Sequence, residues 1–494
     1  MTNATPGPAR SASSLSTSKL VRGFLLGLLV AALVIRLLIS LTRFVDGDEW
    51  EHLNAASFVA QGERPYVTFF ENHPPLTILL LQPAVRSADD PAVIIRVARI
   101  FLYLISLGAL AVVALLGRSL AGPIGALLAP LLLLTLEVFF QKSLEARPDG
   151  PAMLFLLGAL LSFAGAARRG SFARLVVGGA CLTLSVLFTP KVIYAAAGAV
   201  LGVLIAFPAA SRRQRIATGL RALVAMAAGG GLVAGLAVAI MAQQGILKGF
   251  VNDCVKVSLT MVIDNPAAFL RSGLTGSLRD NSVVWALGVA GLVQAVLAGR
   301  HRRHAIVAIC GASFLLGVAG LFHIDAPLRQ YYLTFVPQLA LFAALALTSL
   351  LDWVWAHAGR GITIGLLALV LALSIGPPAG AVWNARKPEI LELQLRVLNR
   401  VLDVTQPGDR VFDCWTGLYL TRLPAFRYFF LNSDVQRLFA PGELEAQLGP
   451  ALRDPRVRVV IRDAYFATLP ESMQSYALAE FAPLPDANLI LVRR

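Results

Sequence analysis

Ionisable residues are concentrated in a short segment that follows the first apolar run of the chain. The residues of this cluster are Asp46, Asp48, Glu49, Glu51 and His52, and Glu71, Asn72 and His73 follow some twenty positions later. A carboxylate within hydrogen-bond reach of a hydroxyl can accept its proton while a new bond forms. Neighbouring carboxylates and partial burial are expected to raise the pKa of such a group, which makes it a stronger base.

Basic side chains that could face these acids are spread along the rest of the sequence. They are Arg96, Arg99, Arg147, Lys191 and Arg329, and each is predicted close to the same membrane face as the acids. Cations and backbone N–H groups can take up the charge that grows on a leaving phosphate. The two sets together predict a group-transfer site at the edge of a membrane.

The composition predicts a polytopic α-helical membrane protein. Of the 494 residues, 57% are hydrophobic and 15% are charged, whereas an ordinary soluble chain carries about 25% charged residues. A membrane-spanning helix needs roughly 17–25 apolar residues. We expect about eleven spans, near residues 20–42, 94–117, 122–140, 151–167, 174–190, 192–209, 221–243, 282–299, 305–322, 331–350 and 361–382. Only Pro190 and Lys191 separate the fifth from the sixth.

The net charge of +14 is explained by topology, so it does not indicate nucleic-acid binding. Lys and Arg gather in every second connection between the predicted spans, as in Arg168 and Arg169 or Arg212 and Arg213. Short loops rich in these residues stay cytoplasmic. The N-terminus is therefore predicted to be cytoplasmic, and the acidic first loop and the C-terminus to be extracytoplasmic.

Three regions are predicted: a disordered cytoplasmic tail (1–19), a transmembrane part (20–384) with outer loops at 43–93 and 244–281, and a small extracytoplasmic α/β domain (385–494). A helix is expected from Glu49 to Gln61, with Asp46 and Asp48 as candidate N-caps. In the last region, β-rich runs at 410–414, 457–461 and 488–492 alternate with a helical pattern at 390–404. Cys254 and Cys414 are both predicted outside, where they could pair in an oxidising compartment.

The triplet Asp46-Gly47-Asp48 matches the Asp-x-Asp pattern with which many soluble glycosyltransferases hold a metal and a nucleotide sugar. Its predicted position on the outer face argues against this meaning, because nucleotide sugars are not expected there. A divalent metal near Asp46, Asp48 and Glu49 is compatible with the sequence but is not required.

Several motifs occur in a characteristic order. They are Asp48-Glu49, a helix up to Gly62, Pro65-Tyr66, His73-Pro74-Pro75-Leu76, Arg147-Pro148-Asp149, Pro190-Lys191, and Arg329-Gln330-Tyr331-Tyr332 with Pro337. This order resembles polyprenyl-phosphate-dependent glycosyltransferases of the glycosyltransferase C superfamily, typified by protein O-mannosyltransferases and the aminoarabinose transferase that acts on lipid A. The resemblance extends from residue 20 to about residue 350.

The resemblance implies an inverting hexosyl- or pentosyltransferase of the bacterial inner membrane that works on the periplasmic side. Its donor would be a sugar on a polyprenyl phosphate such as undecaprenyl phosphate. Its acceptor would be a glycolipid such as lipopolysaccharide, a polysaccharide or a protein of the cell envelope. The implied catalytic residues are Asp48, Glu49 and Asp149; the implied donor-phosphate ligands are His73, Lys191, Arg329 and Arg147; the implied acceptor or pocket residues are Asp46, His52, Tyr66 and Tyr332. His52 departs from the aromatic residue common at its position.

Simpler structural roles remain open for these residues. Asp48 could cap the helix that begins beside it, and His73 could shape an extended turn before two prolines. Lys191 could extend to lipid headgroups, as is also expected of Arg36. His323 and Asp325 are too few to form a metal site by themselves.

Two other functions also remain open. A transporter or lipid flippase would favour ionisable groups near the middle of the membrane and inverted repeats, and the sequence has no internal repeat of this kind. A non-catalytic assembly or sensing protein would use the C-terminal region as its binding module.

Overall fold

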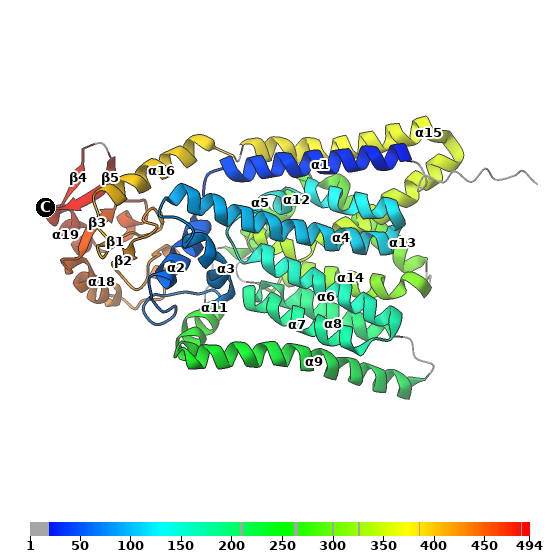
Figure 1. The fold of residues 1–494 in the computed structure, drawn as a ribbon, viewed down its shortest axis with the longest axis horizontal. Coiled ribbons are helices and arrows are strands. Elements are labelled where there is room, and N and C mark those ends of the chain that lie inside the picture. The colour runs from blue at the N-terminus through cyan, green and yellow to red at the C-terminus, as the bar shows by residue number, and fades with distance from the viewer. Residues whose placement is uncertain are drawn as a thin grey trace, which may run out of the picture.

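The computed structural model describes residues 19–207, 211–260, 265–298, 301–324, 327–384, 386–485 and 487–494. Residues 1–18 of the predicted tail (1–19) and Asp325 lie outside this range. Long helices run side by side through most of the molecule, and a small sheet lies at one end (Figure 1).

Apolar helices occupy the predicted spans. In the described part of the chain, five are long and apolar enough to cross a membrane by themselves. They are α1 (Lys19–Thr42), α4 (Pro91–Thr135), α6 (Asp149–Arg169), α9 (Arg212–Gln243) and α15 (Val336–Asn384). Shorter apolar helices are α7 (Phe172–Phe188), α8 (Ile193–Ala206) and α14 (His301–Gly320), while α12 (Pro266–Asp280) and α13 (Ser282–Leu297) meet at 91° and together can make a sixth span.

Kinks and breaks between the predicted runs coincide with glycine or proline residues. α4 and α15 each cover two predicted runs and kink at Gly122 and Gly359, whose φ values are 77° and 83°. Only glycine adopts such angles readily. The closely spaced pair at 174–190 and 192–209 forms two separate helices, α7 and α8, joined by a 3-10 turn at Pro190–Val192.

Glycines allow several of these helices to pack closely. A Cβ atom at Gly229 of α9 would collide with the carbonyl of Val176 on α7, and one at Gly198 of α8 would collide with the carbonyl of Ala312 on α14. Small residues at such contacts permit close backbone approach where lipid removes the hydrophobic driving force between helices.

Arg36 is buried between helices, so the expectation that it extends to the headgroups is wrong. Its guanidinium donates to Ser106 Oγ at 2.9 Å, to the carbonyl of Phe139 at 3.4 Å and to Ser143 Oγ. These partners on α4, α5 (Glu137–Lys142) and the loop after α5 satisfy the charge internally.

The C-terminal region is an α/β unit built on a five-stranded sheet in the order β2-β1-β3-β5-β4. The strands are β1 (Arg410–Phe412), β2 (Leu423–Pro424), β3 (Val457–Ile461), β4 (Phe481–Leu484) and β5 (Ala487–Arg493). β1 pairs in parallel with β2 and β3, whereas β5 pairs antiparallel with β3 and β4. The helices are α16 (Pro388–Asp403), α17 (Ser433–Gln436), α18 (Glu443–Arg453) and α19 (Glu471–Glu480). The positions of β1, β3, β5 and α16 agree with the sequence pattern, whereas β2, β4 and the other helices were not predicted.

The segment between α1 and α4 folds into α2 (Gly47–Ala60) and α3 (Leu76–Val85), which lie between the long helices and the sheet (Figure 1). Its apolar side chains share one core with the C-terminal unit: the ring of Phe58 lies 5.3 Å from Phe69 and 5.1 Å from Phe429. Asn54 also donates to the carbonyl of Gly417 at 2.9 Å. This segment is thereby anchored to the C-terminal unit.

The segment between α9 and α13 is also largely helical in its described part. It contains α10 (Leu247–Phe250), a π-helical turn (Val251–Lys256), α11 (Val257–Thr260) and α12. The pairing of Cys254 with Cys414 is not formed, since both thiols are buried and free.

Candidate functional site

The N-terminus of α2 is capped by Asp46. Its side chain accepts from the backbone N–H of Asp48 at 3.2 Å, and its own N–H donates to Glu49 Oε2 at 3.1 Å, which completes a capping box. Asp48 therefore does not cap the helix. It lies in the first turn, and its carboxylate is available for other contacts.

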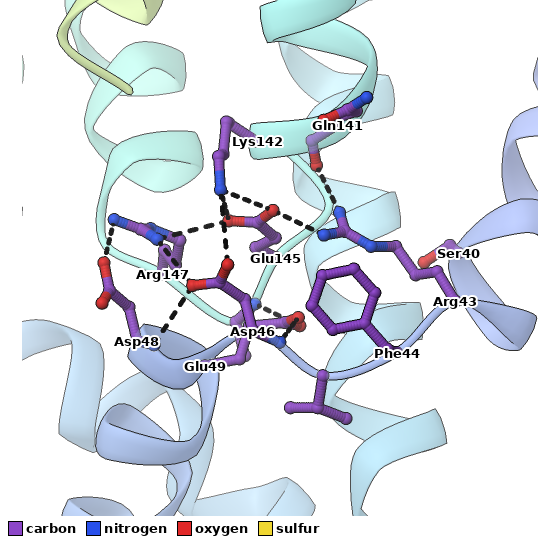
Figure 2. A network of polar contacts seen from close by, with 12 residues as sticks. Ser40, Arg43, Phe44, Asp46, Asp48, Glu49, Gln141, Lys142, Glu145 and Arg147 are labelled. Atoms are coloured by element: carbon purple, nitrogen blue, oxygen red, sulfur yellow. Dashed lines mark hydrogen bonds and ion pairs between the residues drawn. The ribbon is translucent and has the colours of Figure 1, made fainter. Parts of the chain in front are cut away.

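Arg147 connects the acids of this region (Figure 2). Its guanidinium pairs with Asp48 and lies 3.3 Å from Asp46, 3.4 Å from Glu145 and 3.5 Å from Asp149. The side chain of Arg147 is 4% exposed, whereas that of Asp48 is 33% exposed. A buried cation thus orients a carboxylate that still reaches the surface.

The pKa of Asp48 is lowered, contrary to the sequence-based expectation that it is raised. Burial raises it, but the positive charges of Arg147, then Lys191, Lys142 and His73, lower it more. The neighbouring acids have the complementary effect on Arg147, whose pKa they raise against the opposing effect of burial. Asp48 is accordingly ionised near neutral pH.

Glu49 is fully buried and occupied by structural contacts. Its carboxylate lies 3.1 Å from Nη2 of Arg99 and accepts from the N–H of Ala146 at 3.1 Å. Arg99, on α4, also donates to the carbonyls of Ser40 and Arg43. Burial raises the pKa of Glu49, and the charges of Arg99 and Arg43 outweigh that effect and lower it. These contacts tie α2 to α4 and to the loop that carries Arg147.

Asp149 and Lys191 extend the charged cluster. Lys191 Nζ lies 3.3 Å from Asp149 Oδ1 and 5.2 Å from the ring centroid of Tyr331. The Lys191 side chain is 13% exposed, so it is held by these partners instead of extending into lipid headgroups. The contacts form a continuous series from Asp48 through Arg147 and Asp149 to Lys191.

Arg329 and Tyr332 lie next to the charged cluster. Arg329 pairs with Glu137, and both Arg329 and Tyr332 line a small cleft with Gly273 and Asn281. Among the described contacts none joins Arg329 directly to Asp48. The 3-10 turn at Arg329–Thr334 connects this cleft to the charged cluster, because Tyr331 of the turn contacts Lys191.

A second polar cluster surrounds His73. Its Nδ1 lies 2.9 Å from Glu71 and 3.3 Å from Glu51, and its ring lies 4.7 Å from that of His52. Burial lowers the pKa of His73, but the hydrogen bonds and charges of Glu51 and Glu71 raise it to about 10. Tyr66 donates to the carbonyl of His73 at 2.6 Å and so fixes the loop.

Residues that sequence reasoning overlooked complete the main cluster. Lys142 Nζ lies 2.9 Å from Glu145 and 3.7 Å from Asp46, and Arg43 lies 2.8 Å from Glu145 (Figure 2). The only sequence signal for Glu145 was its position two residues before Arg147. The large apolar cavity lined by Leu120, Leu201 and Leu315 has no residue of the charged cluster in its wall.

The comparisons with known proteins find a partial family match and solved structures with a similar fold. Residues 72–235 match the family described as dolichyl-phosphate-mannose-protein mannosyltransferase. This match and the structural similarities described next confirm the resemblance inferred from the motifs.

Two solved structures illustrate the similarity. ArnT from Cupriavidus metallidurans bound to undecaprenyl phosphate has 14% identity and a TM-score of 0.60, over 95% of this chain and 98% of that one. The oligosaccharyltransferase of Archaeoglobus fulgidus, tethered to an acceptor peptide, has 15% identity and a TM-score of 0.55, over 94% of this chain and 74% of that one. No curated protein matches the sequence significantly.

Proposed function

We propose that this protein is an inverting glycosyltransferase of the bacterial inner membrane, which moves a sugar from a polyprenyl phosphate to an acceptor hydroxyl on the outer face. The observation that carries the proposal is the state of Asp48. It is ionised, partly exposed and paired with Arg147 beside further cations. The ArnT structure with undecaprenyl phosphate supports the class of donor.

In the proposed reaction, Asp48 accepts the proton of the acceptor hydroxyl as its oxygen attacks the anomeric carbon. The bond between that carbon and the phosphate oxygen breaks, and the polyprenyl phosphate leaves with the bonding electrons. A single displacement inverts the anomeric configuration. A low pKa makes Asp48 a weak base, so the proton is transferred late, when the attacking oxygen has become acidic.

The cations have complementary roles in this proposal. Arg147 orients Asp48 and, with Lys191, offsets the charge of the departing phosphate. Asp149 positions both cations through its two contacts. Glu49 positions α2, while Arg329 and Tyr332 would contact substrate groups farther along the site.

The placement of the site outside the cytoplasm is supported by the basic residues of the alternate connections. Asp46 and His52 would border the acceptor side, with Tyr66 holding the loop before α3. The acceptor class stays open among glycolipids, polysaccharides and proteins of the envelope.

A reconstitution experiment tests this function. Purified protein in lipid nanodiscs is given a radiolabelled sugar on polyprenyl phosphate together with an extract of envelope lipids and glycans. We expect release of polyprenyl phosphate and a labelled product of inverted anomeric configuration by NMR. Movement of intact donor across the membrane of proteoliposomes, without cleavage of the bond between sugar and phosphate, would instead identify a flippase.

A further inference from the structure

Four metal-ligating side chains converge in the outer loop, beside the charged cluster but separate from it. Glu51 and His52 come from one turn of α2, and Glu71 and His73 from the loop before α3. Each offers one ligand atom, and these atoms all lie within 4.8 Å of one another. Glu51, His52 and Glu71 are buried.

Two buried polar atoms of this cluster lack a hydrogen-bond partner. Within the described structure, His52 Nδ1 and Glu71 Oε2 accept or donate no hydrogen bond. Glu51 Oε1 is also buried and lies 3.3 Å from His73 Nδ1. Burying polar atoms without partners is unfavourable, so two such atoms beside the Glu51 carboxylate are suited to hold a cation.

We propose that Glu51, His52, Glu71 and His73 form a binding site for one divalent transition-metal ion of the zinc type. Imidazole nitrogens and carboxylate oxygens are ligands that Zn²⁺ accepts, at roughly 2.0–2.2 Å in tetrahedral geometry. Such bonds place ligand atoms roughly 3.4 Å apart, and the ligand atoms of these four side chains lie within 4.8 Å of one another.

The ligand set also selects the class of ion. Two imidazoles disfavour Ca²⁺ and Mg²⁺, which prefer oxygen ligands alone. The loop is already fixed around the site, because the N–H of His73 donates to Glu71 Oε1 at 2.8 Å and Tyr66 donates to the carbonyl of His73. Contacts of this kind orient metal ligands before the ion binds.

This site does not depend on the proposed sugar transfer. Binding of the ion would join α2 to the loop before α3 and would keep a positive charge where His73 now acts on Asp48. The ion would then stabilise the loop that presents Asp48, whichever reaction that loop serves.

The test measures metal binding by the full chain, without any sugar donor. Purified protein in nanodiscs is dialysed against a chelator and titrated with Zn²⁺ by calorimetry, and the bound metal is counted by elemental analysis. We expect one Zn²⁺ per chain. Glu71→Gln and His52→Asn should each weaken binding at least tenfold, while His357→Gln, which changes an exposed imidazole on α15, should leave it unchanged.

A second measurement guards against variants that fold poorly. Circular dichroism and thermal unfolding without metal establish that each variant is folded, and Glu51→Gln supplies a further ligand change. Co²⁺ in place of Zn²⁺ should give the visible absorption of a tetrahedral site in the wild type. Absence of stoichiometric binding to the wild type, or equal affinity in the folded ligand variants, would overturn the proposal. Sugar transfer is assayed separately, so the two proposals can fail independently.

Discussion

At the residue scale, Asp46 and Asp48 have different roles, and this difference determines which chemistry the site can support. Both acids precede the predicted helix closely enough to cap it, and sequence alone could not separate them. Asp46 takes the cap, since Gly47 already belongs to α2. Asp48 is left to pair with Arg147, which lies almost a hundred residues later and whose contact with α2 no local pattern reveals.

The ionisation of Asp48 leads to a pH prediction. Its folded pKa lies below the unfolded value, so its ion pairs stabilise the protein above the unfolded pKa, and this contribution is lost as the pH falls through the folded pKa. The facing charges are Arg147, Lys191, Lys142 and His73. We expect kcat/KM to show no acid limb from Asp48 between about pH 6 and 8.

The variant Arg147→Gln tests this pH prediction. It removes the largest favourable charge while burial remains, so the pKa of Asp48 should rise and an acid limb should move toward neutral pH. An acid limb that is already present near neutral pH in the wild type, and that stays in place in Arg147→Gln, would contradict this assignment.

At the scale of elements, the apolar helices were predictable because lipid requires long apolar runs with their backbone hydrogen bonds satisfied internally. The burial of Arg36 was not predictable from the sequence, because its partners Ser106 and Ser143 are supplied by packing between distant segments. The non-helical residues Gly122 and Gly359 explain why α4 and α15 each divide into two predicted runs.

The cap of α2 can be tested by two substitutions at Asp46. Asn is as good an N-cap as Asp, whereas Ala removes the acceptor at a cost of about 0.5–2 kcal/mol. Hydrogen exchange of the first-turn amides of α2 should therefore accelerate in Asp46→Ala and change much less in Asp46→Asn. Equal acceleration in both variants would mean that the charge, paired with Arg147, matters more than the cap.

Close helix packing can be tested on a single helix. Gly229→Ala places a Cβ against the carbonyl of Val176, while Gly231→Ala, also on α9, meets open space. Overpacking typically costs about 1–3 kcal/mol. Thermal unfolding in nanodiscs should show a clear loss for Gly229→Ala and none for Gly231→Ala; similar curves would refute the predicted contact.

At the scale of the whole molecule, the segment between α1 and α4 and the C-terminal unit form one core. The sequence predicts β1, β3, β5 and α16, because their patterns are local, but it gives no sign that Phe58 and Phe429 meet. That contact joins α2 to a segment more than three hundred residues later. The segment that carries Asp48 is consequently supported by the sheet on one side and by the apolar helices on the other.

Phe429→Ala tests this shared core. Deleting a buried aromatic side chain typically costs about 3–5 kcal/mol, and here it should loosen α2 as well as the C-terminal unit. Hydrogen exchange should increase in both segments, whereas Leu489→Ala, at a residue that is 48% exposed, should affect neither. Loosening of the C-terminal unit alone would show that the two segments are independent.

We propose that Asp48 accepts the proton in a transfer of sugar from a polyprenyl phosphate. The most direct measurement compares transfer rates of Asp48→Asn and Asp89→Asn, which alters an exposed carboxylate of the same loop. Loss of a general base typically costs roughly 10²–10⁴-fold in rate. We predict such a loss for Asp48→Asn, at unchanged thermal stability, and wild-type activity for Asp89→Asn. Transfer by Asp48→Asn at the rate of the control would contradict the account.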